Sequence, residues 1–179
     1  MNKSVIGIVE SPEVAEQIVA ELQAAGLSQS AISVLLPDTE GTRDFAHKHS
    51  TKAPEGAAAG ASAGGVLGGT IGLLAGVGAL AIPGLGPFIA AGPLMAALSG
   101  AAAGAAVGGV TGALIGLGIP EIEAKRYEGK LRGGNILIAA HVETSEAQKA
   151  AEEVLKENGA HDVSTTSESS VPTRHEARP

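Results

Sequence analysis

The sequence predicts an α+β fold in which a long helical hairpin, rich in glycine and alanine, interrupts a small two-layer domain. Three observations lead to this expectation. Residues 56–120, a stretch of 65, contain no Asp, Glu, Lys, Arg or His, although the chain of 179 residues has 12 Lys and Arg and 19 Asp and Glu. Glycine recurs at every fourth position in two parts of that stretch. The charged segments on either side resemble each other, and each reads strand, helix, strand.

Composition excludes several functional classes. The chain has no cysteine, which excludes disulfides, thiol catalysis and cysteine-ligated zinc or iron–sulfur centres. The formal net charge of −7 argues against nucleic-acid binding by the chain as a whole. With 26 Gly and only 2% aromatic residues, the chain lacks the large side chains on which an ordinary globular core depends. We therefore expect no nucleic-acid partner, and we expect that the chain is not one ordinary globular domain.

The first half of the interrupted domain is expected at residues 1–37. It reads as a strand at 4–10, a helix at 12–25 and a strand at 31–36. Ser11 is a favourable N-cap with proline directly after it, and Gly26 is well placed as the left-handed residue that ends the helix.

The second half is expected at residues 135–166. Val142-Glu143-Thr144 repeats Val9-Glu10-Ser11 at an offset of 133 positions. A strand at 135–142, a helix at 145–158 capped by Thr144 or Ser145, and a strand at about 162–166 follow the pattern of the first half. Two such βαβ units predict a ferredoxin-like βαββαβ domain, in which a four-stranded antiparallel sheet has two helices on one face.

Between the halves we expect a linker at 38–55, the helical hairpin at 56–119 and a connecting helix at 120–134. The hairpin arms, 57–82 and 94–117, would each be about 35–39 Å long as helices, which is enough to cross a bilayer core of about 30 Å. The residues expected to form the turn between the arms are Pro83, Gly84, Gly86, Pro87 and Pro93. The polar tail, 167–179, is expected to be disordered.

The repeated glycines predict close packing between helices. Residues four apart lie on one helix face, and a row of glycines lets another helix backbone approach closely, as in membrane helix association. Because this row drifts around the helix, one partner cannot cover it, which predicts a homo-oligomer. A flexible Gly/Ala linker and a soluble hairpin buried in an oligomer are the alternatives. The helix-packing residues are Gly60, Gly64, Gly68, Gly72, Gly76, Gly100, Gly104, Gly108, Gly112 and Gly116.

Basic residues on both flanks of the hairpin predict its orientation. Four of them, Lys125, Arg126, Lys130 and Arg132, are expected to lie at the membrane surface and to contact anionic lipid. Because positive charge is retained on the cytoplasmic side, both termini are expected in the cytoplasm.

Four runs of residues carry a resemblance to a known family. Residues 82–93, together with 118–124, 127–129 and 131–134, resemble the hairpin tip and following segment of bacterial general-stress and low-temperature-induced membrane proteins. The resemblance covers most of the chain except the polar tail. It implies a stress-associated protein of the bacterial cytoplasmic membrane and assigns no catalytic residue. The plan is also similar to small subunits of respiratory complexes, from which the Gly and Ala content departs.

No residue is assigned to catalysis, to a cofactor or to a metal. His47 and His49 lie two positions apart, but spacing places no further ligand, so we interpret them as solvated. His141 falls within a strand and has no nucleophile beside it in the sequence. We therefore expect a protein that is not an enzyme.

The leading hypothesis is a membrane-integrated, stress-associated protein that self-assembles through its glycine-rich hairpins. It would display the ferredoxin-like domain in the cytoplasm. One alternative is a regulatory module that binds a small ligand, argued only from the fold. Another is an accessory subunit that anchors an unidentified protein partner. If the hairpins are instead buried within an oligomer, the protein would be cytoplasmic and soluble.

Overall fold

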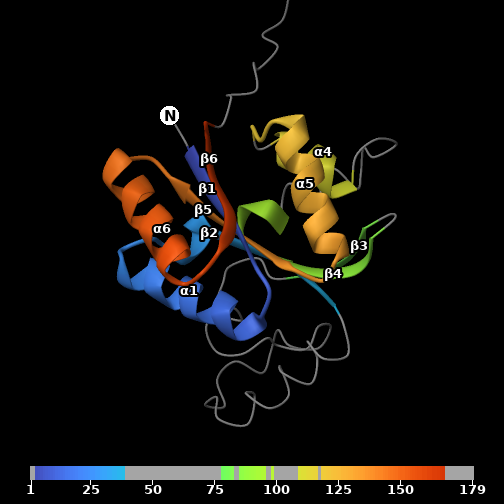
Figure 1. Cartoon of the computed structure of the whole chain (residues 1–179), viewed down its shortest axis with the longest axis horizontal. Helices are drawn as coiled ribbons and strands as arrows, with labels where there is room; N and C mark the ends of the chain where they lie inside the picture. Colours follow the sequence, from blue (N-terminus) through green and yellow to red (C-terminus); the bar gives the residue numbers. More distant parts are fainter. Residues whose placement is uncertain are drawn as a thin grey trace, which may run out of the picture.

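A computed structural model describes residues 3–38, 78–82, 85–95, 98, 109–116 and 118–167. Within these ranges six strands form one antiparallel sheet, and helices lie on both of its faces (Figure 1). This arrangement confirms the predicted α+β class. The strands are β1 (Lys3–Val9), β2 (Ile32–Pro37), β3 (Gly78–Ile82), β4 (Gly86–Ala91), β5 (Ile136–Val142) and β6 (His161–Ser167). The helices are α1 (Pro12–Ala24), α4 (Gly109–Gly116), α5 (Glu121–Arg132) and α6 (Ser145–Glu157), with a 3-10 turn, η1, at Gln29–Ala31.

Helices α1 and α6 cover one face of the sheet (Figure 1). Their local chemistry follows the expectation. The Ser11 side chain accepts a hydrogen bond from Val14 N–H, and the Thr144 side chain accepts one from Ala147 N–H, which satisfies backbone donors that a helix start leaves unpaired. The first core lies between these helices and the sheet. It includes Val5, Ile18, Leu22, Ile32, Val34, Ile138, Ala151 and Leu155.

The two sequence repeats interlock in the sheet. The strand order is β3-β4-β2-β5-β1-β6, so β1 lies between β5 and β6 while β5 also pairs with β2. Each helix therefore connects two strands that are separated by a strand from the other repeat. The bounds of these four strands and two helices differ from the expected ones by at most one residue.

The prediction that residues 78–82 end a helical arm was wrong, because they form strand β3. The chain reverses direction between Ile82 and Gly86, which are opposite each other, so the reversal at the expected turn joins two strands, β3 and β4, rather than two helices. Strand β4 pairs with β2 from Val34↔Ala91 to Pro37↔Phe88. Without β4, the backbone of β2 would be an open edge beside a buried core, so the pairing satisfies hydrogen-bonding groups that would otherwise lack partners.

Helices α4 and α5 cover the second face, which makes a three-layer arrangement (Figure 1). The second core joins apolar side chains of the sheet, such as Ile6, Leu35, Phe88 and Leu137, to Leu94, Val110, Leu114, Ala124, Tyr127 and Leu131. Helix α4 is only 8 residues long and buries Val110, Ala113 and Leu114. The end of the expected second arm therefore packs on the sheet. Among the residues that the structure describes, no helix is both long and apolar enough to cross a membrane.

Candidate functional site

A row of polar side chains crosses the sheet on the face that α4 and α5 cover. Its centre is His141 on β5, whose Nδ1 lies 3.0 Å from Ser4 Oγ on β1 and whose Nε2 lies 2.9 Å from Ser33 Oγ on β2. The backbone N–H of Leu94 donates to Ser33 Oγ at 3.0 Å. We call these four residues the His141 cluster. It ties three strands to the helical turn that begins at Pro93.

The imidazole of His141 fits between the two serine hydroxyls in either neutral tautomer, because a neutral imidazole has one donor and one acceptor nitrogen, whereas a hydroxyl can donate and accept. If the proton lies on Nδ1, Nε2 accepts from Ser33 Oγ and Nδ1 donates to Ser4 Oγ. If it lies on Nε2, the two directions are reversed. In both cases hydrogen bonds link the Leu94 backbone, through Ser33 and His141, to β1.

The distances between the serine hydroxyls and His141 are those of a nucleophile and its base. The two serines, however, are more deeply buried than a nucleophile would be. Catalytic serines lie within about 2.6–3.2 Å of the histidine that activates them. Ser4 and Ser33, however, are each 0% exposed, so neither hydroxyl offers a surface to a substrate in this conformation. The arrangement is suited to positioning the three strands rather than to attack on a carbonyl.

Sequence reasoning missed this cluster. His141 was expected to lack a neighbouring nucleophile, yet its partners are 137 and 108 positions away along the chain. The sequence held one indication of the cluster, because Ser33 is the only hydroxyl-bearing residue in the otherwise apolar strand β2. Only the register of the strands shows that Ser4, Ser33 and His141 share one face.

Thr166 extends the polar row to the edge strand β6. It is opposite Ser4 in the register of β1 and β6, and paired residues of neighbouring strands share a face of the sheet. Thr166 is 6% exposed, and its Oγ1 has no hydrogen-bond partner among the described residues.

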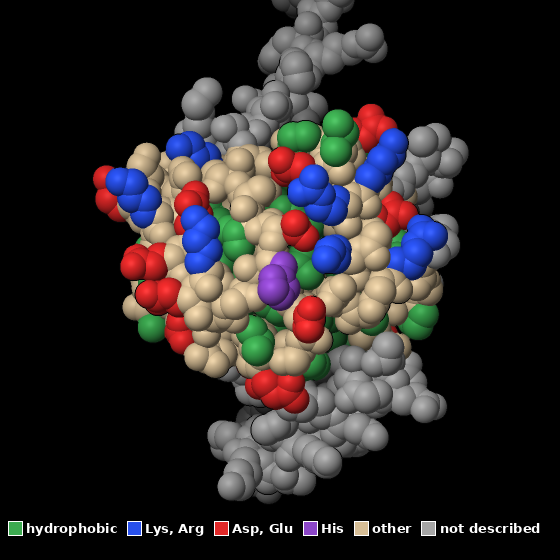
Figure 2. All heavy atoms as spheres, in the orientation of Figure 1, with side chains coloured by type: hydrophobic (Ala, Val, Ile, Leu, Met, Phe, Trp, Pro, Cys, Tyr) green, Lys and Arg blue, Asp and Glu red, His purple; other side chains and the backbone are tan. Residues whose placement is uncertain are grey.

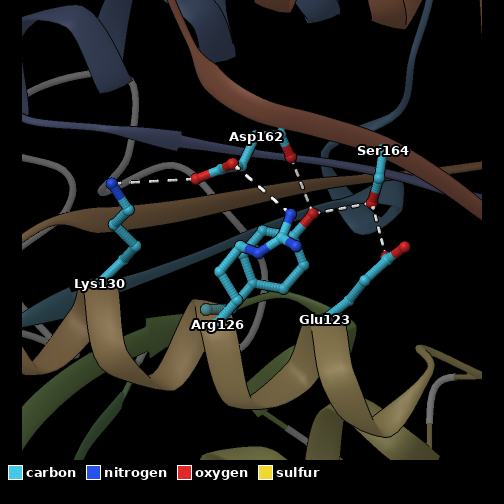
Figure 3. A network of polar contacts seen from close by, with 6 residues as sticks. Glu123, Arg126, Lys130, Asp162 and Ser164 are labelled. Atoms are coloured by element: carbon cyan, nitrogen blue, oxygen red, sulfur yellow. Dashed lines mark hydrogen bonds and ion pairs between the residues drawn. The ribbon is translucent and has the colours of Figure 1, made fainter.

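A second polar network fastens α5 to β6 (Figure 3). The Tyr127 hydroxyl lies 2.8 Å from the carbonyl oxygen of Asp162 and 2.7 Å from Ser164 Oγ. Ser164 Oγ donates to a carboxylate oxygen of Glu123 at 3.1 Å. Figure 3 shows Glu123, Arg126 and Lys130 on α5, directed toward Asp162 and Ser164 on β6. The network holds α5 against the sheet at its β6 edge.

Burial dominates the electrostatics of Tyr127. The residue is 2% exposed, and burial raises the pKa of its hydroxyl, while the hydrogen bond to Ser164 acts in the opposite direction. Nearby carboxylates of Glu123 and Asp162 also raise this pKa. A buried phenol disfavours its charged form, so Tyr127 stays protonated well beyond neutral pH.

The four basic residues predicted for a membrane surface all lie on α5, and each faces a carboxylate. Lys125 pairs with Glu121 at 2.6 Å and Arg132 with Glu128 at 2.8 Å. Arg126 and Lys130 approach the two carboxylate oxygens of Asp162 at 3.8 and 3.9 Å. Figure 2 shows positive and negative side chains interspersed over the visible face. Carboxylates therefore offset much of the positive charge of α5.

Hydrogen bonds lower the pKa of two of these carboxylates, Glu121 and Glu128. The hydrogen bond from Lys125 holds the pKa of Glu121 below its ordinary value. Thr111 on α4 donates to Glu128, and this hydrogen bond lowers the pKa of Glu128. The Thr111–Glu128 contact also links α4 to α5.

Most of the predicted helix-packing glycines, from Gly60 to Gly108, lie outside the described residues. The two that are described, Gly112 and Gly116, belong to α4. A Cβ atom built on Gly116 would meet no other atom within 4 Å, so no described helix packs closely against it.

Of the residues predicted for the turn, Gly86 and Pro87 begin β4, and Pro93 begins the helical turn that follows it. Pro83 and Gly84 lie outside the described residues, as do His47 and His49. In the part of the chain that the structure describes, no group of three or more His, Asp or Glu side chains could hold a metal ion.

Comparison with protein-family models, with curated proteins and with solved structures finds no match to this chain. The resemblance to bacterial stress-associated membrane proteins stays a prediction.

Proposed function

We propose that this chain is a non-enzymatic, stress-associated protein that self-assembles and associates with a membrane through its charge-free insert. The observation that carries the proposal is the insert itself. It has 65 residues without a formal charge and glycines spaced by four. In water each such glycine would cost a helix about 0.8–1 kcal/mol relative to alanine, so the repeat is favourable only where close helix packing compensates for it.

Part of the insert belongs to the packed unit, so we leave that part out of the assembly role. Residues 78–95 and 109–116 contribute strands and helices to the three-layer unit. We assign the membrane and assembly role to residues 57–77 and 96–108, which contain Gly60 to Gly76 and Gly100 to Gly108. Because β2 and β3 of the same sheet precede and follow the first segment, we propose that this segment enters the membrane and returns on the same side.

We further propose that the rest of the chain is a ferredoxin-like domain extended by a β-hairpin. The order β2-β5-β1-β6, antiparallel throughout, supports this assignment. The two helices α1 and α6 on one face also support it. In this assignment β3, β4, α4 and α5 are additions that lengthen the sheet and cover its second face.

The non-enzymatic part of the proposal rests on burial. The Ser–His pairs of the His141 cluster are the contacts that come closest to a catalytic arrangement, and both serines are 0% exposed. A nucleophile must reach its substrate, so we assign the cluster a structural role. No cofactor is required by this proposal.

We propose that the protein lies at the bacterial cytoplasmic membrane with both termini in the cytoplasm. Lys125, Arg126, Lys130 and Arg132 would then face anionic lipid. Their contribution is expected to be smaller than about 1 kcal/mol each, because each already faces a carboxylate of this chain.

Carbonate extraction of membranes from expressing cells tests the proposal. The chain is expected to stay in the membrane pellet, and clean release into the soluble fraction would contradict membrane association and favour a soluble oligomer. The double variant Gly64→Leu, Gly68→Leu should reduce the mass of the particle in mild detergent, because leucine side chains prevent close helix approach. Gly129→Leu is the matched control, since Gly129 lies on α5 outside the glycine repeats and has open space around it.

A further inference from the structure

Strand β3 forms one edge of the sheet, and no described strand pairs with its outer side. We infer that this edge is an interface at which two copies of the chain pair through β3 in antiparallel orientation. The inference concerns the folded unit and is independent of the glycine repeats to which we assign membrane association.

Pro87 determines which backbone groups of β3 face outward. In the register of β3 and β4, Ala81 is opposite Pro87, which has no N–H to donate. The carbonyl of Pro87 accepts a hydrogen bond from Asp38 N–H at 3.0 Å, so the backbone of Pro87 is directed toward the β2 side. In an antiparallel pair such positions alternate with hydrogen-bonded ones.

The outward groups follow from this alternation. Gly78, Leu80 and Ile82 direct their N–H and C=O groups at β4, opposite Ala90, Phe88 and Gly86. Ala79 and Ala81 therefore direct theirs away from the sheet. The outer side of β3 offers two donors and two acceptors that no described residue satisfies by strand pairing.

The sequence of β3 lacks the features that prevent edge pairing. Edge strands are commonly protected by charged residues, particularly lysine, or by proline. Residues 78–82 contain neither, and the nearest charged residues along the chain are Glu55 and Glu121. An edge of this kind is a template for another strand.

A second copy is the occupant that fits this edge best. A two-fold axis at Leu80 pairs all five residues of β3 with those of its partner. It places Ala79 opposite Ala81 of the other copy, so that each outward donor meets an outward acceptor. Because the strand is uncharged, no like charges meet across the axis. The same patch on both copies gives a closed dimer and a sheet that continues from one copy into the other.

Single cysteines test the pairing and its register, because the natural chain contains none. With the axis at Leu80, the two copies of Leu80→Cys face each other in a pair without hydrogen bonds, where Cα atoms lie about 4.5 Å apart. That distance is within the range for a disulfide. Mild oxidation of the full chain should cross-link Leu80→Cys into a covalent dimer.

The register supplies matched controls. Gly78→Cys alone should not cross-link, because two copies of residue 78 would be about 13 Å apart. The same applies to Ile82→Cys alone, whereas a mixture of the two variants should cross-link. Absence of the Leu80→Cys dimer, or equal cross-linking at all three positions, would overturn the inference. The first result indicates that another segment of the chain covers the edge, and the second indicates random collision.

A backbone variant keeps the inference testable if a cysteine disturbs folding. Ala81→Pro removes an outward N–H without removing a donor to β4, so it should lower the mass of the particle in mild detergent. Ala81→Gly retains the N–H and should not. An unchanged mass for Ala81→Pro overturns the inference, whereas the proposed function fails separately, by release of the chain in carbonate.

Discussion

Ser33 and His141 illustrate how single residues hold distant segments of this chain together. Ser33 Oγ accepts from Leu94 N–H at 3.0 Å and lies 2.9 Å from His141 Nε2, and it is fully buried. A buried donor that loses its acceptor costs about 1–3 kcal/mol, which is more than the net gain from an average hydrogen bond. The cluster therefore affects stability mainly because its loss would leave a buried backbone donor without a partner, and less through the net free energy of its hydrogen bonds.

Replacing Ser33 by alanine should lower the free energy of unfolding by about 1–3 kcal/mol, because the Leu94 N–H loses its acceptor inside the protein. Urea denaturation measures the change. Ser30→Ala is the matched control, since Ser30 is exposed and bonds only to Ser28 among the described residues, and its effect should stay within about 0.5 kcal/mol. Equal effects of the two variants would contradict the structural role of the cluster.

Tyr127 should make stability depend on pH in the alkaline range. Its pKa in the folded protein is raised by burial, whereas in the unfolded chain it is about 10. Above pH 10 the unfolded chain loses this proton while the folded protein retains it. Alkaline pH therefore favours the unfolded state, and the contribution of Tyr127 to stability falls as pH rises.

Tyr127→Phe checks this linkage. At neutral pH the variant should be less stable by about 1–2 kcal/mol, because it loses the contacts of the hydroxyl with Asp162 and Ser164. The difference between wild type and variant should narrow as pH rises from about 10 to 11, which thermal or urea unfolding at each pH would measure. A difference that is constant over this range would contradict the raised pKa.

At the scale of elements, two glycines have opposite roles. Gly92 follows β4 with φ of +76°, and a Cβ atom there would lie 2.1 Å from the carbonyl oxygen of Ile32. Only glycine allows the chain to pass β2 so closely on its way to the helical turn at Pro93. Gly129 lies within α5 and has open space around it. No described residue therefore requires glycine at this position for close contact.

Alanine substitutions should therefore have effects of opposite sign. Gly129→Ala should stabilise the protein by about 0.5–1 kcal/mol, because alanine favours helix. Gly92→Ala should destabilise it by at least about 2 kcal/mol through strain and overlap. Thermal unfolding of both variants measures the contrast. A stable Gly92→Ala protein would show that β4 does not approach β2 as described.

Local sequence patterns were sufficient to predict helices α1 and α6. The caps at Ser11 and Thr144 and the apolar faces of α1 and α6 are local features, and the two helices begin where those features place them. Strands β3 and β4 have no comparable local signal. Their glycines and prolines suggest a turn between helices, and they are strands only because β4 pairs with β2 and β3 pairs with β4.

At the scale of the whole molecule, the described parts of the charge-free insert complete the packed unit. Residues 86–91 extend the sheet beside β2, and α4 and α5 close its second face. An antiparallel sheet can have one face open to solvent, but here both faces are buried. The segments that we assign to membrane association are thus connected at both ends to the packed unit.

The sequence by itself determined the α+β class, the two repeats and their helix caps, because these depend on residues close together in the chain. It also determined the charge-free insert, which is a matter of composition. Only the tertiary structure decided that residues 78–82 and 86–91 are strands, that α4 is buried, and which residues bond to His141. The pairing of residues 88–91 with β2 and the partners of His141 depend on groups more than 40 positions apart that meet through the register of the sheet, and no local pattern encodes that register.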